Sequence, residues 1–501
     1  MAATSSEDDM RRRFEEISKF AQGNGKVVLT CRTNFFHLDT EAKKILSPTD
    51  IATGLLKQSQ QCNTDILYIE PFKERQILEF LSRHPSIAAR AQEWWDDIQR
   101  ISGLATLSTR PILLKMLVDT IPSPGYSPPP SIPVAEQVAS IYATFVDNLL
   151  KRDKSKGRTL VLSPKERLLF LQVLALDTLS MSIKYFHWDS LPASTRALVD
   201  KWQQDKKRPD WLDYDLRNNP LLHRHGDQFT FIHESFTEFL AAISIAEYLT
   251  GNNTYTQLEL YQDALNEGVR RFVVGIIGLL QQTGAFTYRQ PEQASSVGNK
   301  MTLIPAGPFI SRGYNSELVI KELNKPVFIS KYPVTWREYE MFKPNLRNKI
   351  GIEASDLAPA VWISWEDAMA YCYWFRQQYD RKAFRLPTED EWEKAARGID
   401  GRLYPWGDEE ATSERANYGY GKGHTVPVDS YPAGVGPYGT WDMSGNVAEL
   451  TSTFLNEEVA YICRGGSWQD PASRIQCAAW RLIRFNSRLL DVGFRIALDA
   501  S

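Results

Sequence analysis

The chain has 501 residues, of which 43% are hydrophobic and 12% aromatic, which is enough for about two to four domains with substantial cores. Its net charge of −3 and pI of about 6.2 disfavour nucleic acid as the main partner. The five cysteines are widely spaced and form no CxxC pair, which argues against a disulfide framework and against a zinc site and fits a reducing cytoplasm.

The first 16 residues are acidic and then basic, without the apolar core of a signal peptide. The longest apolar run, Phe272 to Leu280, is too short for a membrane span, which takes about 20 residues. The sequence therefore predicts a cytoplasmic protein with no membrane partner. A β-branched run at 26–30 predicts a buried parallel strand, and the polar residues 31–34 predict a loop at its end.

The region up to residue 285 is predicted to be mainly helical. Apolar residues recur at helical spacing, as at Val138, Ile141, Phe145 and Leu149. Prolines make 121–134 an extended linker between residues 1–120 and 135–285.

Three segments of this region resemble NACHT or STAND-type signal-transducing NTPases, namely 27–34, 108–114 and 231–242. The resemblance implies a C-terminal remnant of the NTPase domain with a helical segment at 1–120, and a helical and winged-helix region at 135–285. It also implies three nucleotide contacts, at Arg32, Pro111 and His233. No GxxxxGK(S/T) motif cradles phosphates, so we expect ATP or ADP to bind only together with a missing N-terminal half. The chain would then be the C-terminal part of a longer protein or a truncated gene product. His233 alone would be a buried or capping histidine.

Residues 286–299 are polar and weakly patterned, and predict the main domain boundary. After Lys300, short apolar runs alternate with Gly, Pro and Trp, which predicts short strands and many loops. Two helices are predicted from capping boxes, one opening at Ser364–Asp367 and one at Thr388–Glu391.

An ordered series of motifs runs through 300–501. They are Met301–Gly307, Tyr332–Thr335, Pro359–Trp362, Arg385–Arg397, Tyr404–Gly407, Asp442–Val447, Arg464–Trp468 and Gly493–Arg495. In this order they resemble the formylglycine-generating enzyme (sulfatase-modifying factor) family. The resemblance implies an α+β domain with the C-type lectin fold. Most of the Trp, Gly, Asp and Arg residues in these motifs are expected to be structural.

Enzymes of that family use two cysteines to hold copper, and soft thiolates suit Cu(I). Cys477, followed by two alanines, resembles the second of these positions, but the first corresponds to Ala472. Cys463 is distant in sequence. Because a lone thiol cannot form the paired site, we predict that the domain is not an enzyme and that Cys477 is a small buried residue.

The family resemblance also implies a calcium site. Asn446, Val447 and Glu449 match one calcium segment, and Asn417 matches part of another. Carboxylate and carbonyl oxygens are the ligands that calcium prefers.

Residues 469–490 mix large apolar side chains with arginines in a pattern that fits neither a helix nor a half-buried strand. The segment lies within 464–495, between Arg464–Trp468 and Gly493–Arg495. This layout resembles the variable proteins of diversity-generating retroelements, in which the intervening residues form an exposed ligand-binding face. The resemblance assigns ligand contacts to Gln469, Asp470, Trp480, Leu482, Ile483, Phe485, Ser487, Leu489 and Leu490. An exposed apolar patch with Trp and Arg is typical of a binding surface.

We therefore expect a bacterial ligand-binding protein whose lectin-like domain recognises a ligand, expected to be a protein. Its STAND-like region would couple binding to signalling and form a homo-oligomer. Three alternatives stay open: a formylglycine-generating-type cysteine oxidase, a signalling ATPase completed by the missing half, and a scaffold without a ligand.

Overall fold

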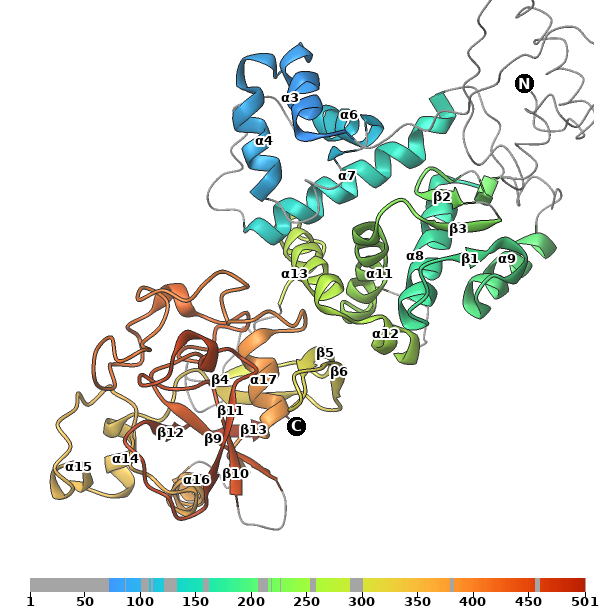
Figure 1. Cartoon of the computed structure of the whole chain (residues 1–501). Helices are drawn as coiled ribbons and strands as arrows, with labels where there is room; N and C mark the ends of the chain where they lie inside the picture. The colour runs from blue at the N-terminus through green and yellow to red at the C-terminus, as the bar shows by residue number, and fades with distance from the viewer. Residues whose placement is uncertain are drawn as a thin grey trace, which may run out of the picture. The chain divides into compact units, whose positions relative to one another are not determined.

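The computed structural model describes residues 72–85, 87–100, 108–109, 111–120, 133–155, 162–205, 215–217, 219–225, 227–252, 258–288, 301–378, 383–455 and 460–500 (Figure 1). The predicted strand at 26–30 and Arg32 lie outside these residues, as do residues 121–132 of the predicted linker 121–134 and residues 289–299 of the predicted linker 286–299. None of the helices in the described ranges combines the length and apolar character that a membrane-spanning helix needs. The chain forms two compact units, one of residues up to 127 with 141–240, the other of 128–140 with 241–501.

The first unit is mainly helical. Its helices are α3 (Glu74–Arg83), α4 (Ala91–Arg100), α6 (Pro111–Thr120), α8 (Pro164–Ser180) and α9 (Ala193–Asp205), and it shares α7 (Val134–Ser155) and α11 (Glu234–Leu249) with the second unit. A small antiparallel sheet has the order β1 (Phe186–His187), β3 (Gln228–Phe231), β2 (Leu222–His225). Helix α8 begins at Pro164 because Ser163 and Glu166 form a reciprocal capping box.

The second unit starts with helices that precede the predicted boundary at 286. Helices α12 (Leu258–Ala264) and α13 (Glu267–Gln282) belong to it. The Arg270 guanidinium, on α13, is 1% exposed and lies 2.6 Å from Glu267 and 2.9 Å from Asp408. Arg312 is 2.9 Å from the other oxygen of Glu267. The structure therefore groups residues from 241 onward with the C-terminal domain, although the sequence separates them at 286.

The C-terminal domain is α+β, with two four-stranded sheets and a hairpin. One sheet has the order β11 (Trp480–Arg484), β10 (Ala460–Arg464), β9 (Ala448–Phe454), β12 (Val492–Phe494). The other has the order β4 (Met301–Ile304), β7 (Val327–Ser330), β13 (Ala497–Asp499), β8 (Phe384–Arg385), and β5 (Gly307–Arg312) pairs with β6 (Leu318–Leu323). All pairs are antiparallel except β12 with β9, which is parallel. The helices are α14 (Trp336–Phe342), α15 (Leu346–Lys349), α16 (Trp365–Gln378) and α17 (Glu389–Arg397).

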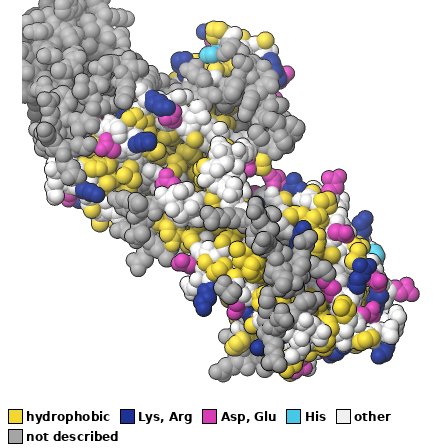
Figure 2. All heavy atoms as spheres, turned by 180° about the vertical axis from the view of Figure 1, so that it is seen from behind, with side chains coloured by type: hydrophobic (Ala, Val, Ile, Leu, Met, Phe, Trp, Pro, Cys, Tyr) yellow, Lys and Arg dark blue, Asp and Glu magenta, His cyan; other side chains and the backbone are white. Residues whose placement is uncertain are grey.

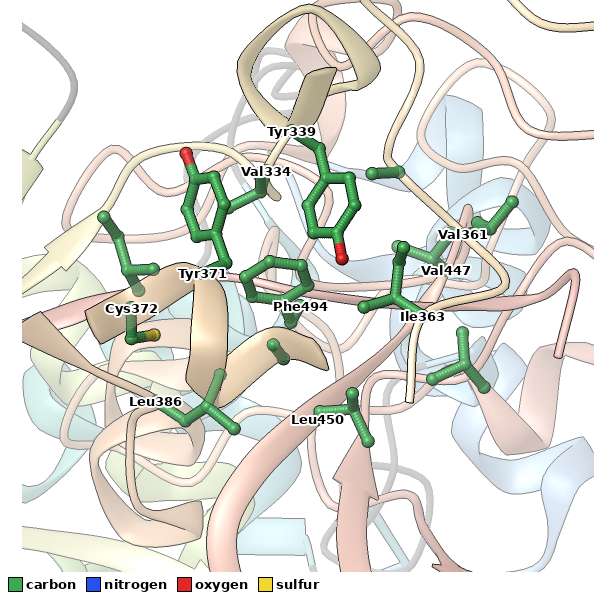
Figure 3. Close-up of a cluster of buried hydrophobic side chains, with 14 of the residues drawn as sticks. Val334, Tyr339, Val361, Ile363, Tyr371, Cys372, Leu386, Val447, Leu450 and Phe494 are labelled. Carbon is green, nitrogen blue, oxygen red and sulfur yellow. The ribbon is translucent and has the colours of Figure 1, made fainter. Parts of the chain in front are cut away.

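The main core of this domain lies between the first sheet and helices α14 and α16 (Figure 3). Phe494 of β12 packs edge-on against Tyr371 of α16 and Tyr339 of α14, with ring centroids 5.4 Å and 6.1 Å away. Aliphatic side chains complete the cluster, such as Leu450 of β9 and Val447, which comes just before β9. This core packs against one face of the sheet. The two predicted helices, α16 and α17, begin at the residues that their capping boxes predicted.

Candidate ligand-binding face

A buried ion-pair network holds the start of the candidate ligand-binding segment, residues 464–495. Arg464, at the end of β10, is 1% exposed and its Nη2 lies 3.0 Å from Glu389 and 3.3 Å from Glu393, both on α17. Glu393 also pairs with Arg397 at 2.6 Å, and neither of these side chains is exposed. Burial alone would raise the pKa of Glu393, but the two arginines outweigh it and lower that pKa. These buried ion pairs between β10 and α17 therefore form a fixed frame, and the candidate segment begins at its edge.

A second buried pair holds the end of the segment. Arg495 donates to both carboxylate oxygens of Glu449, one of them at 2.6 Å, and neither side chain is exposed. The Trp392 indole donates to the same carboxylate at 2.7 Å. The remaining guanidinium hydrogens reach the carbonyls of Ser330 and Trp441. Glu449 is thus a structural anion in the centre of the domain.

These bonds bear on the predicted calcium ligands. The Glu449 carboxylate is shared by Arg495 and Trp392. The Asn446 Oδ1 accepts from Asn417 at 3.2 Å and from the Val426 amide at 3.0 Å. The Val447 side chain lies in the core, and the described residues contain no cluster of three or more His, Cys, Asp or Glu side chains. The side-chain oxygens of Asn446 and Glu449 are therefore already hydrogen-bonded, whereas the Asn417 Oδ1 is buried without a hydrogen-bond partner among the described residues. Calcium binding stays a prediction.

The cysteines have separate surroundings. Cys463 lies in the core on β10, across from Leu450 and Arg481. The Cys477 amide donates to the Leu403 carbonyl, and its thiol lies among Arg397, Glu393 and Arg402. Both thiols are free and buried, and burial raises the pKa of Cys477 to about 12 and that of Cys463 as well. Both thiols are therefore protonated at neutral pH, and a copper ion bound there would have to displace the thiol protons.

Strand β11 carries the first half of the candidate face. It is an edge strand, and its burial alternates: Leu482 is 46% exposed, Ile483 is 6% exposed and Arg484 is exposed. Ile483 departs from the prediction, because the period of two turns it into the core beside Cys463. Trp480 is half-buried, with its ring edge-on to Tyr314 at 4.8 Å.

The residues after β11 form the second half. Leu489 is 39% and Leu490 52% exposed, while Phe485 and Ser487 are half-buried. In the described part of the chain the only exposed leucines are Leu482, Leu489 and Leu490. Apolar side chains left in water in one short segment indicate a binding surface.

Asp491 ties the two ends of the segment together. Its carboxylate accepts from Arg481 at 2.6 Å and from the Ser467 hydroxyl at 3.2 Å. Ser467 also donates to Asp470 at 2.7 Å. The predicted contacts Gln469 and Asp470, both half-buried, therefore lie near the end of the same segment.

Trp362 is a neighbour that the sequence analysis missed. Its amide donates to the Leu489 carbonyl at 2.8 Å, and the Arg488 guanidinium lies 5.6 Å from its ring centroid. Trp362 is 37% exposed and has a φ of +61°, which is unfavourable for a bulky side chain. Such strained residues cluster at binding sites.

Tyr420 is a second missed neighbour. Its amide donates to the Trp468 carbonyl at 2.8 Å, it is 64% exposed, and its φ is also +61°. The flanking Gly419 and Gly421 were the signal in the sequence that the backbone turns there. Trp362 and Tyr420 thus extend the candidate face beyond 464–495.

Two predicted nucleotide contacts lie in the described part of the first unit. Pro111 is the first residue of α6. The His233 Nδ1 accepts from the Ser235 amide at 3.1 Å and lies 2.7 Å from the Ser235 hydroxyl, just before α11. His233 therefore caps α11 in this structure.

Comparison with known proteins agrees with the motif order. Residues 287–500 match the family described as the sulfatase-modifying factor enzyme 1-like domain. The C-terminal domain is therefore similar to sulfatase-modifying factor enzyme 1-like domains, with the C-type lectin fold that the motif order predicted. The match covers the lectin-like domain and the residues that carry the candidate face.

This sulfatase-modifying-factor-like domain has relatives with and without activity. It is 39% identical over 128 residues to the inactive C-alpha-formylglycine-generating enzyme 2 of Bos taurus, covering 23% of this chain and 40% of that protein. It is 36% identical over 178 residues to the formylglycine-generating enzyme of Streptomyces coelicolor, covering 28% of this chain and 53% of that protein. The chain thus spans about half or less of these relatives' lengths.

Among solved structures, Treponema denticola variable protein 1 is 21% identical, with a TM-score of 0.36 over 40% of this chain and 95% of that one. PvdO from Pseudomonas aeruginosa is 24% identical, with a TM-score of 0.34 over 40% of this chain and 94% of that one.

Proposed function

We propose that the C-terminal domain is a non-catalytic ligand-binding module and that its ligand is a protein. The observation that carries this proposal is the segment 480–490, which exposes three leucines together with Arg484 and Arg488 beside a frame of buried ion pairs. Apolar side chains exposed to water lower the solubility of a protein. Their burial by a bound partner contributes about 25 cal/mol of binding free energy per Å² of apolar surface. The diversification of this segment, as in variable proteins, is part of the proposal.

The cysteines support the absence of catalysis. Ala472 stands where the first copper-binding cysteine would fall, and its carbonyl accepts from Tyr404. Cys477 is buried as a protonated thiol among charged side chains that pair with one another. Ala472 therefore leaves Cys477 without the second thiolate that a paired Cu(I) site requires at that position.

The first unit supplies the second part of the proposal, a STAND-type signalling module. Its order of α8, β1, α9 and the hairpin β2–β3 supports the winged-helix interpretation of 135–285. In this proposal Arg32, Pro111 and His233 contact ATP or ADP only when a phosphate-binding half is joined to the chain. Oligomerisation through this unit would then carry the signal of ligand binding.

The proposal is tested by selecting a displayed library of random peptides on the immobilised full chain. The comparison variant carries Leu482→Ser, Leu489→Ser and Leu490→Ser, which remove apolar area only at exposed positions. We expect peptides selected on the wild type to bind this variant at least about tenfold more weakly, since each leucine contributes up to about 1 to 2 kcal/mol. A matched control, Met341→Ser, changes a side chain that is 66% exposed on α14 and should leave binding intact.

Selected peptides that bind the triple variant and the wild type equally would contradict the proposal. The oxidase alternative is tested on the same preparations, with a cysteine-containing substrate peptide, Cu(I) and dioxygen. We expect no aldehyde product. Aldehyde formation that disappears with Cys477→Ser would establish the oxidase instead.

A further inference from the structure

We infer the chemistry of the partner: the candidate face takes an acidic stretch of polypeptide that also carries aliphatic side chains. This inference rests on the proposed function and deepens it. It is carried by the balance of charges on the segment and by the kind of apolar side chain that the segment exposes.

Cations outnumber carboxylates on the segment. From Gln469 to Asp491 the chain has four arginines and two aspartates. Both aspartates already accept hydrogen bonds, Asp470 from Ser467 and Asp491 from Arg481 and Ser467. No carboxylate of the described residues lies within ion-pair distance of Arg474 or Arg484, and both side chains are exposed.

The excess of positive charge extends to the part of the face near Trp362. Arg488 and Lys343 share a single carboxylate, that of Asp367, and their side chains are 38% and 40% exposed. Trp362 holds the Arg488 guanidinium against its ring at 5.6 Å. One positive charge is therefore left over here, on a side chain whose position is fixed before any ligand arrives.

This local excess contrasts with the net charge of −3 of the whole chain. A positive patch on an acidic protein selects an acidic partner and repels basic ones. Arginine also offers the paired N–H groups that match a carboxylate.

The apolar side chains favour polypeptide over the other polyanions. Leu482, Leu489 and Leu490 are aliphatic and suit aliphatic or aromatic side chains of a protein. Single-stranded nucleic acid is held mainly by aromatic rings that stack on bases, whereas the large apolar side chains exposed within 480–490 are leucines. Figure 2 shows one side of the whole molecule, on which hydrophobic side chains lie among charged ones at the surface.

The test uses the full chain and synthetic peptides of about 12 residues that alternate Glu or Asp with Leu or Val. Matched peptides carry Gln and Asn, or Lys, in place of the acidic residues. We expect the acidic set to bind at least about tenfold more tightly than the neutral set, and its affinity to fall about tenfold between low and high salt. The double variant Arg474→Gln and Arg484→Gln should weaken acidic peptides about fivefold more than neutral ones.

Arg376→Gln is the matched control, because Arg376 is exposed near the far end of α16. Equal binding of acidic and neutral peptides would overturn the inference. So would tighter binding of a single-stranded oligonucleotide, or of phosphatidylserine vesicles, than of the acidic peptides.

The outcomes separate this inference from the proposed function. If library-selected peptides bind the face but are neutral or basic, the inference fails and the proposed function stands. If no peptide of any charge distinguishes the wild type from the triple leucine variant, the proposed function fails as well.

Discussion

Two sets of arginines in the C-terminal domain use the same side chain for opposite purposes. Arg397, Arg464 and Arg495 are 0 to 1% exposed, and each pairs with a buried glutamate. Arg474 and Arg484 are exposed and pair with no carboxylate of the described residues. The first set fixes the fold, and the second is free to meet a ligand.

The difference lies in the partner and not in the residue. A buried charge is tolerated only with a counter-charge and hydrogen bonds, so the frame arginines cannot be exchanged without cost. An exposed charge gains little from any internal partner and can change without harm to the fold. A domain built this way can keep its frame while its face varies.

The largest expected effect on stability comes from replacing the buried arginine of the Arg495–Glu449 pair, compared with the same replacement of an exposed arginine on the face. Arg495→Met leaves the Glu449 carboxylate buried without its guanidinium, and we expect the free energy of unfolding to fall by about 3 to 5 kcal/mol. Arg484→Met should change it by less than about 0.5 kcal/mol. Chemical denaturation of both variants checks this, and equal losses would remove the distinction between frame and face.

Asp442 sharpens the comparison from inside the frame. Burial raises the pKa of this carboxyl well above its usual range, which Arg495 opposes and Glu449 reinforces. One carboxylate oxygen, Oδ2, is buried without a hydrogen-bond partner among the described residues. The unfolded carboxyl ionises near pH 4 but the folded one stays protonated, so stability falls as pH rises from about 4 towards the folded pKa.

Asp442→Asn removes that pH-dependent loss, and asparagine also tolerates the φ of +54° at this position. We expect a gain of about 1 to 2 kcal/mol at pH 7 and almost none at pH 4. Unfolding titrations at the two pH values measure it. A different result would mean that Asp442 binds calcium: the variant is less stable, and calcium no longer changes its free energy of unfolding as it does that of the wild type.

Asp367, at the edge of the face, should show the opposite pH dependence. Burial would raise its pKa, but hydrogen bonds from Lys343 and Arg488 outweigh burial and lower the pKa to about 2. Its contribution is therefore present above pH 4 and is lost as pH falls from about 4 to about 2. Because both cations are partly exposed, we expect Asp367→Asn to cost about 1 kcal/mol at pH 7. The difference from wild type should vanish near pH 2, and a constant difference would refute the assignment.

The smallest expected effect concerns backbone strain at the face. Tyr420 is 64% exposed with a φ of +61°, so Tyr420→Gly removes strain and little burial. We expect unfolding stability to rise by about 0.5 to 1 kcal/mol while peptide binding weakens. Glycine at Tyr373, which is exposed within α16, serves as the control and should destabilise by a similar amount. A loss of stability at Tyr420 would show that its side chain supports the fold.

Much of the fold was predictable because short sequence patterns determine it. The capping boxes at Ser364 and Thr388 predicted where α16 and α17 begin, and both helices form there. The order of motifs predicted the lectin-like domain, which the family match confirms.

The remaining features depend on tertiary contacts that no local pattern encodes. Ile483 turns inward because β11 pairs with β10, and this register became visible only in the sheet. Trp362 and Tyr420 reach the face through backbone bonds to Leu489 and Trp468, residues far away in sequence. Arg270 joins α13 to Asp408 across a polar stretch that the sequence marked as a boundary.

Hydrogen exchange on the full chain, with and without a library-selected peptide, tests the division between frame and face most directly. We predict that the bound peptide slows exchange at 480–490 and around Trp362 and Tyr420, while exchange in α17 and β12 stays as it was. Protection confined to other parts of the chain, with 480–490 unchanged, would contradict the account.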